Sequence, residues 1–304
     1  MPSPTRVTPG GPSDAMSARL HVPIQYRFLA PLLVLLAIVV IYPLGYSAWL
    51  SLTDRTITRP QTSFVGLEQY GSLVGNSGYG VAMRNTFVFV LFAVGLELVL
   101  GLAIAMALQR QRWARDATRA FLLTPMFITP IAVGLMFRFL LNQQLGPIPA
   151  ALGSVGLDID FFGTRLALPT IIAIDVWQWT PFLVLLLLAG LESLPRQPIE
   201  AARVDGASAW LTFRRVTLPL LKPVIAIAVL LRALDAFKVF EYVFAITRGG
   251  PGNATDTLQY LIYRTGFQFF RLGEAAAMGF VLVAIVLVLV TFLYRTLLRQ
   301  KARL

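Results

Sequence analysis

Long stretches of apolar residues, separated by shorter polar segments, dominate the sequence. Each stretch has the roughly 20 mostly apolar residues that an α-helix needs to cross the hydrocarbon core of a bilayer. The pattern therefore predicts an all-α membrane protein with six transmembrane helices, whose even number puts both chain ends on one side. The approximate spans are 28–52, 85–108, 120–141, 166–191, 220–246 and 274–298.

Composition agrees with this pattern. Of the 304 residues, 57% are hydrophobic and only 13% are charged, whereas a soluble protein carries about 25% charged residues. The chain has no cysteine and one histidine, His21, which lies in the N-terminal tail. We therefore expect no disulfide, no metal site and no catalytic residues of the Cys or His type.

The net charge of +11 does not indicate nucleic-acid binding, because the charges lie at the ends of apolar spans and form no single patch. Fifteen of the 26 Lys and Arg residues lie in four segments on one side of the predicted topology: 1–27, 109–119, 192–215 and 295–304. Seven lie in the loops on the other side. The positive-inside rule then predicts a multi-pass protein of the cytoplasmic membrane with cytoplasmic termini. Residues 28–298 are expected to form one six-helix domain. Residues 1–27 are expected to form a disordered cytoplasmic tail before it, and residues 299–304 a short cytoplasmic tail after it.

The fourth span places polar and aromatic side chains halfway across the membrane: Asp175, Trp177, Gln178 and Trp179. Indole rings can stack on the C–H faces of a sugar, while amide and carboxylate groups hydrogen-bond its hydroxyls. The group is therefore a candidate substrate pathway. The alternative, that the tryptophans fill gaps between helices, is equally compatible with the sequence.

The fifth span carries four charges of alternating sign at intervals of three: Arg232, Asp235, Lys238 and Glu241. On a helix, neighbours three residues apart can meet, so each charge has a possible partner. Charged residues at membrane depth mark a substrate pathway or a network inside the bundle; a ladder that only fixes helix packing is the alternative. Glu97 in the second span likewise needs a partner or water.

A polar, basic segment separates the fourth and fifth spans, IEAARVDGASAWLTFRRVTLPLLKP at residues 199–223. Its composition predicts a helix, a turn at Gly206, where glycine accepts positive φ, and a second helix. Glu200, Ala201, Ala202 and Asp205 precede the turn. On pattern alone, an ordinary loop would serve as well.

The spacing of this segment resembles the EAA loop of permease subunits of ATP-binding-cassette (ABC) importers. The family pattern is Glu-Ala-Ala, three residues, Gly, nine residues, an aliphatic residue, one residue and Leu-Pro, and residues 200–219 fit it. The segment FEYVFAITRGGPGNATDTLQYLIYRTGF at 240–267 resembles the outer loop of the carbohydrate branch, which includes maltose, trehalose and glycerol-phosphate permeases. In that branch, Gly249, Gly250, Pro251 and Gly252 would lie at the external gate, near a docked binding protein.

The resemblance implies a type I ABC importer permease fold and alternating access with a midplane substrate site. It implies that the loop at about 196–219 docks on an ATPase, with Glu200 as a charged contact, Ala201 and Ala202 permitting close approach, Gly206 making the turn and Asp205 steadying it. The expected partners are two ATPase subunits, a second homologous permease and an external substrate-binding protein. The chain has no Walker A sequence, so ATP and Mg²⁺ are expected on the ATPases, with no cofactor and no catalysis on this chain.

Two other classes of function stay open on the residues alone. A proton-coupled secondary transporter could use the intramembrane carboxylates, and an intramembrane enzyme would need nucleophilic or metal chemistry for which the spans hold no His or Cys. The expected cargo is a neutral sugar, oligosaccharide or polyol.

Overall fold

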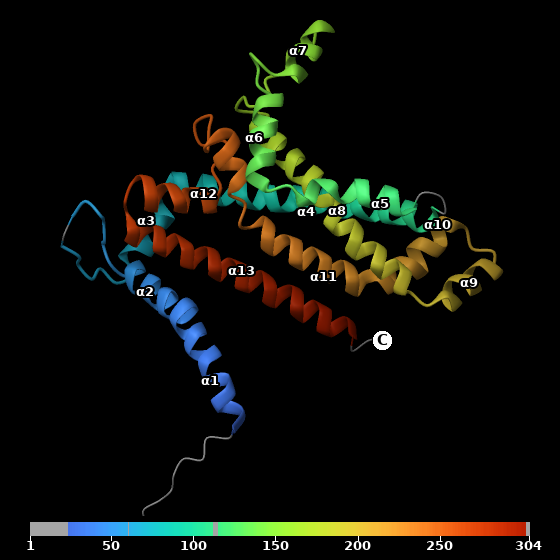
Figure 1. Ribbon diagram of the computed structural model, residues 1–304, viewed down its shortest axis with the longest axis horizontal. Helices are drawn as coiled ribbons and strands as arrows, with labels where there is room; N and C mark the ends of the chain where they lie inside the picture. Colours follow the sequence, from blue (N-terminus) through green and yellow to red (C-terminus); the bar gives the residue numbers. More distant parts are fainter. Residues whose placement is uncertain (1–23, 60, 112–114, 302–304) are drawn as a thin grey trace, which may run out of the picture. The chain divides into compact units, whose positions relative to one another are not determined.

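The computed structural model describes residues 24–59, 61–111 and 115–301 (Figure 1). Over these residues the backbone is helical apart from turns, loops and two isolated β-bridges, Thr53–Phe64 and Thr56–Arg271. The predicted all-α class is therefore confirmed. The chain divides into two compact units, Met1–Ser47 and Ala48–Leu304. The predicted tails lie mostly outside the described residues.

The described part of the first unit is one helical run. It consists of α1 (Ile24–Leu36), a π-helical turn (Ala37–Ile41) and the start of α2 (Tyr42–Ser51). The 21 residues Pro31–Ser51 are long and apolar enough to cross a membrane. This run matches the first predicted span.

Four long helices form most of the second unit: α4 (Ser77–Arg110), α8 (Ala167–Ser193), α11 (Leu218–Ala236) and α13 (Leu272–Lys301). At 1.5 Å per residue, the 34 residues of α4 extend for about 50 Å, so this helix is longer than the ~30 Å hydrocarbon core. The shorter helices are α3 (Glu68–Gly75), α5 (Arg115–Leu123), α6 (Pro130–Leu140), α7 (Pro147–Ser154), α9 (Arg196–Val204), α10 (Ala209–Thr212) and α12 (Leu258–Tyr263).

The third predicted span is broken. Residues Ala117–Phe127 and Pro130–Leu140 form two helical pieces that meet at 90°. Pro130 begins α6, and a proline disfavours the helical conformation in the residue before it; Thr129 is accordingly extended. The described residues thus hold five continuous helices able to cross a membrane, or six spans if the bent pair counts as one.

The fifth predicted span is shorter at its far end than the sequence suggested. The helix α11 ends at Ala236, ten residues before the expected end. Beyond it, the N–H of Lys238 bonds the carbonyl of Asp235 at 2.9 Å, and the Thr257 hydroxyl bonds the carbonyl of Val239 at 3.1 Å. Lys238 and Glu241 therefore do not continue the helical spacing that begins at Arg232.

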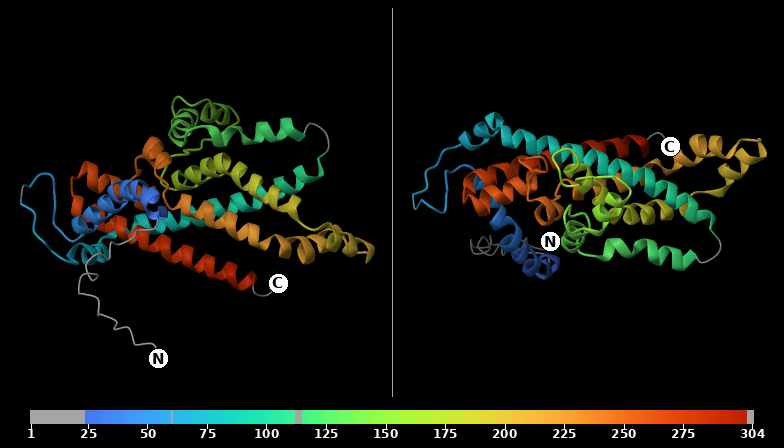
Figure 2. Two further views of the ribbon diagram at one scale, coloured as in Figure 1. Left: turned by 60° about the horizontal axis from the view of Figure 1, so that its bottom comes forward. Right: turned by 90° about the horizontal axis from the view of Figure 1, so that it is seen from above.

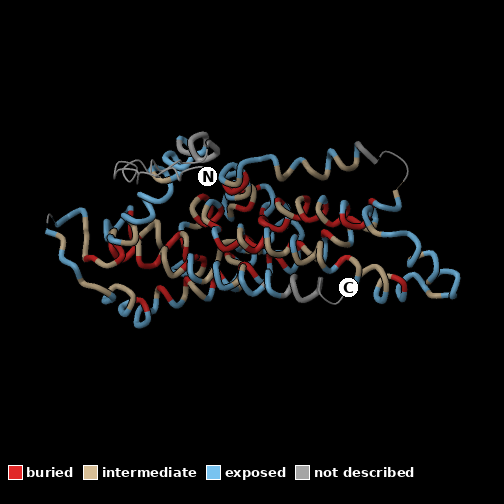
Figure 3. The backbone as a smooth tube through the Cα atoms, turned by 90° about the horizontal axis from the view of Figure 1, so that it is seen from below, coloured by how far each residue is buried: buried red, intermediate tan, exposed pale blue. Residues whose placement is uncertain are grey.

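The core of the second unit lies between α4, α8 and α11. The first two run side by side, α11 packs against both, and α13 packs against α11 (Figure 2). A Cβ atom on Gly101 would lie 3.0 Å from the Cβ of Leu183, so this glycine allows α4 to approach α8 closely. Figure 3 shows the buried positions concentrated along these central helices. The same core also encloses several charged groups.

Candidate functional site

The α9–α10 segment (residues 196–217) is the surface that matches the predicted docking loop. The helix α9 has no buried residue, and Glu200, Ala201 and Asp205 are exposed while Ala202 is half-buried. Val204 is 88% exposed. A short helix whose sides are nearly all open leaves its surface available for contact with another protein.

The turn after α9 has the hydrogen bonds of a Schellman motif. The N–H of Ala207 bonds the carbonyl of Ala202 at 3.0 Å, and the N–H of Gly206 bonds that of Arg203 at 3.1 Å. Gly206 has φ +78°, the left-handed conformation that this motif requires and that glycine adopts without strain. The helix, turn and helix are confirmed. Asp205 ends α9, but its side chain forms no hydrogen bond within the described residues, so nothing supports a steadying role for it.

An ionic network joins the three central helices. Arg232 on α11 bonds Glu97 on α4 through two parallel contacts, Nε to Oε2 at 2.7 Å and Nη2 to Oε1 at 2.9 Å. The same Nη2 bonds Asp175 on α8. Arg232 is 1% exposed and Glu97 0% exposed, so each of these charges is removed from water and depends on the others.

A second set of polar contacts extends this network through the fourth span. The guanidinium of Arg232 lies 5.4 Å from the centre of the Trp179 ring, a cation–π distance. The indole N–H of Trp179 donates to the Tyr242 hydroxyl at 3.1 Å, which donates to Gln178 at 2.6 Å. Gln178 in turn donates to the carbonyl of Ile128 at 2.7 Å. That carbonyl lies at the break in the third span, so the network stabilises the break as well.

Three of the predicted pathway residues lie outside this cluster. Trp177 is 42% exposed and packs edge-on against Phe137. Lys238 and Glu241 are exposed and form no ion pair within the described residues. Only the first pair of the predicted charge ladder is present, Arg232 Nη1 to Asp235 Oδ2 at 3.2 Å, and the side chain of Asp235 is 53% exposed. Exposed charges at membrane depth are costly on a lipid-facing surface, so this side of α11 is suited to face water or another subunit.

The predicted outer loop forms a turn at Gly249–Gly252. Gly249 and Gly252 have φ +85° and +61°, and Gly250–Pro251 is a cis peptide. Asn85 on α4 donates to the carbonyls of Asn253, Ala254 and Asp256 at 3.0–3.2 Å. The loop is therefore fastened to the second span, while Pro251 and Gly252 are exposed.

A buried ion pair supports this loop from within. Asp256 is fully buried and bonds Arg264 at 2.6 Å. Burial raises the pKa of the Asp256 carboxyl above its ordinary value, and the positive charge of Arg264 opposes that change. Gly249 lies directly against this carboxylate, and an added Cβ would overlap it. Glycine at this position is thus required by space as well as by backbone conformation.

Sequence reasoning missed some of these groups. Glu97 was recognised as needing a partner, but only the fold shows that the partner is Arg232, 135 residues away. Tyr242 and Asn85 carried no signal, because neither is charged. The described residues contain no group of three or more His, Cys, Asp or Glu that could hold a metal ion.

Comparison with known proteins identifies consistent relatives. Residues 97–304 match the family described as binding-protein-dependent transport system inner membrane component. A probable ABC transporter permease of Sinorhizobium fredii is 37% identical over 88% of each chain. The trehalose/maltose transport system permease MalF of Thermococcus litoralis is 35% identical over 82% of this chain and 84% of that one. The trehalose transport system permease SugA of Mycobacterium tuberculosis is 31% identical over 88% of this chain and 86% of that one.

Two solved structures share the fold over most of the chain. A chain of a bacterial ABC transporter involved in importing the acidic polysaccharide alginate superposes with a TM-score of 0.79 and 24% identity, covering 91% of this chain and 95% of its own. A bacterial alginate ABC transporter in complex with a periplasmic protein that holds an alginate pentasaccharide gives a TM-score of 0.77. The predicted type I importer fold is therefore confirmed.

Proposed function

The chain belongs to the family of binding-protein-dependent transport system inner membrane components, and we propose from this premise that it is the permease subunit of an ATP-driven importer for a carbohydrate. The observation that carries the proposal is the α9–α10 segment, where the EAA spacing coincides with an exposed helix closed by a Schellman turn at Gly206. The relatives named for trehalose and maltose transport support a sugar as cargo.

The proposed assembly contains two ATPase subunits, a second homologous permease and an external substrate-binding protein. ATP and Mg²⁺ are held by the ATPases. The α9–α10 segment lies on the cytoplasmic side, where Glu200, Ala201 and Ala202 contact an ATPase and Gly206 sets the angle of the contact. The turn at Gly249–Gly252 lies on the outer side and contacts the binding protein, and both termini are cytoplasmic, as the positive-inside count suggests.

The proposed transport step is alternating access. Closure of the ATPases moves α9, and α11 transmits that movement because it is continuous with the α9–α10 segment through residues 213–217. The exposed sides of Asp235 and Trp177 are proposed to line the pathway. Asp175, Gln178 and Trp179 are proposed to hold this wall of the pathway in place and not to bind the cargo. Their polar atoms already form hydrogen bonds, with Arg232, Ile128 and Tyr242.

A proton-coupled secondary transporter is the other function considered, and the relatives give it no support. The geometry also disfavours it, because both fully buried carboxylates of the network, Glu97 and Asp175, are bonded to the same guanidinium. Both oxygens of Glu97 and one of Asp175 already accept hydrogen bonds from Arg232, so an incoming proton would have to displace one of these contacts.

The first test is co-purification of the chain from membranes, followed by an assay of ATP hydrolysis. We expect an ATPase and a second permease to accompany it, and its transport to stop when ATP is depleted. A chain that purifies alone, with uptake that collapses only with the proton gradient, would overturn the proposal.

We expect Trp177→Ala and Asp235→Asn each to lower sugar uptake by about fivefold or more, since an aromatic or charged contact that binds a ligand contributes about 1–2 kcal/mol. ATPase assembly should be unchanged because neither side chain lies on the α9–α10 segment. Phe92→Ala is the matched control, an exposed aromatic on α4. If the two variants lose assembly, or if Phe92→Ala lowers uptake equally, the residues serve packing and not the pathway.

A further inference from the structure

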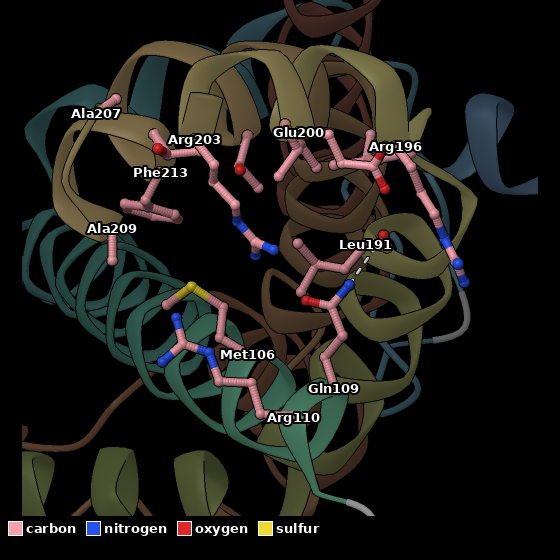
Figure 4. Close-up of a pocket in the computed structure, with 14 residues that line it drawn as sticks. Met106, Gln109, Arg110, Leu191, Arg196, Glu200, Arg203, Ala207, Ala209 and Phe213 are labelled. Carbon is pink, nitrogen blue, oxygen red and sulfur yellow. Dashed lines mark hydrogen bonds between the residues drawn. The ribbon is translucent and has the colours of Figure 1, made fainter. Parts of the chain in front are cut away.

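A cavity of about 760 Å³ lies between α9 and the ends of α4 and α8 (Figure 4). This volume is within the range of small-molecule sites, about 300–1,000 Å³. Its walls come from the last turns of α4, from Leu191 and Leu194 at the end of α8, from α9, and from residues 207–217. The transport mechanism proposed above gives roles to α9 and Glu200, which help to line the cavity, but none to the cavity itself.

The charges that line this cavity are mostly positive. Arg110, Arg196 and Arg203 line it together with one carboxylate, Glu200. Figure 4 shows Arg203 extending from α9 into the hollow and Arg110 facing it from the end of α4. Within the described residues, none of the three guanidinium groups forms an ion pair or a hydrogen bond. The cavity thus presents guanidinium donors that have no partner in the described part of the chain.

A buried hydroxyl gives an independent sign of a missing partner. Thr212 is only 7% exposed and lines the same cavity. Its Oγ1 atom is buried and has no hydrogen-bond partner among the residues that the structure describes. Leaving a buried hydroxyl unpaired is unfavourable, and a rotation of the Thr212 side chain would let a ligand oxygen in the cavity pair with it. An apolar wall that includes Met106, Leu191 and Phe213 completes the lining.

We propose that this cavity binds a phosphate ester. Arg110 and Arg203 would hold the phosphate oxygens from opposite walls, because guanidinium groups match the geometry of a phosphate and bind it through paired N–H donors. The Thr212 hydroxyl would donate to a third oxygen, and the apolar wall would cover the carbon part of the ester. Glu200 lies on the same helix as Arg203 and offsets only part of the positive charge.

Two sources can supply this chemistry. A phosphorylated metabolite can enter from the cytoplasm, and the headgroup of an anionic phospholipid can enter from the bilayer, because Arg110 is the last residue of a membrane-spanning helix. In either case the ligand would link α9 to the end of α4. It would then tie the proposed ATPase-docking helix to the transmembrane core and so change how freely that helix moves.

The test uses the full chain, purified with the subunits that accompany it and placed in lipid nanodiscs. One arm measures binding of radiolabelled glucose 6-phosphate in phosphatidylcholine nanodiscs. The other measures retention of phosphatidylglycerol by native mass spectrometry. We expect one of the two probes to bind, and the Arg110→Gln/Arg203→Gln variant to bind it about tenfold more weakly, as loss of two charge-assisted contacts predicts.

The matched control is Arg214→Gln/Arg215→Gln, which removes the same amount of charge, here at two exposed positions of the α9–α10 segment that do not line the cavity. We expect this control to bind like the wild type, and Thr212→Val, which removes one hydroxyl at nearly constant volume, to bind more weakly. Thr212→Val also serves if the double arginine variant does not fold. The proposal would be overturned if the wild type bound neither probe. It would also be overturned if both double arginine variants lost probe binding to the same extent. A third outcome would also overturn it: no probe binds, and the Arg110→Gln/Arg203→Gln variant loses its ATPases. The cavity would then accept a side chain of an ATPase and not a phosphate ester.

Discussion

Replacing Arg232 with methionine is expected to lower the free energy of unfolding by about 3–5 kcal/mol, the usual cost of removing one partner from a buried ion pair. The variant would leave Glu97 and Asp175 facing each other inside the bundle with no positive charge between them. It would also remove the cation beneath the Trp179 ring. Heating the purified protein and recording the fraction that stays monodisperse on gel filtration would measure the loss.

Two companion variants separate charge from packing. Asp235→Asn should cost less than about 1 kcal/mol, because the Asp235 side chain is half-exposed and exposed ion pairs contribute little. Adding Glu97→Gln and Asp175→Asn to the Arg232 variant should recover most of the lost stability, since no buried charge would then lack a partner. A stable Arg232→Met protein would mean that water, and not the guanidinium, satisfies the two carboxylates.

Gly206→Pro is expected to reduce uptake to the background of an empty vector while the protein still inserts in the membrane. Proline fixes φ near −65°, whereas Gly206 has φ +78°. The variant therefore cannot form the Schellman turn that orients α9 against α10. The side chain of residue 206 would meet no neighbour within 4 Å, so the change acts on the direction of the segment and not on packing. Sugar uptake together with the amount of chain in isolated membranes would measure both effects.

Gly206→Asn is the control for this substitution. Asparagine tolerates the left-handed conformation better than other non-glycine residues, so most of the uptake should remain. If Gly206→Pro transports normally, the turn has no role in coupling to an ATPase. If Gly206→Asn fails as completely as the proline variant, the site needs glycine for close approach of a partner rather than for its backbone angle.

For the outer loop, the sequence predicts the turn but not the contacts that hold it. The run of Gly249, Gly250, Pro251 and Gly252 was enough to predict a turn, and the turn is present. The contacts that support the turn could not be predicted. Asn85 belongs to another span, and the stretch between Asp256 and Arg264 has no regular helix or strand period. Contacts between residues far apart in sequence leave no local signal.

The errors in the predicted spans have the same origin. Hydropathy averages over a window, so it detects that residues 120–141 and 220–246 are apolar but not where the helices end. A proline such as Pro130 disfavours helix in the residue before it, but only the packed structure shows a right-angle break, where the carbonyl of Ile128 accepts a hydrogen bond from Gln178.

By itself, the sequence determined the all-α membrane class, the existence of the apolar spans and the helix–turn–helix at Gly206, because each depends on short-range periodicity, on charge distribution or on one residue's backbone freedom. Only the tertiary structure decided which charges meet. It paired Arg232 with Glu97 and Asp175 on two other helices, and it left Lys238 and Glu241 outside that network where α11 ends. It also enclosed Thr212 beside arginines that have no ion pair within the described part of the chain. Those outcomes depend on how α4, α8 and α11 pack, and packing sums many weak contacts that no single stretch of sequence contains.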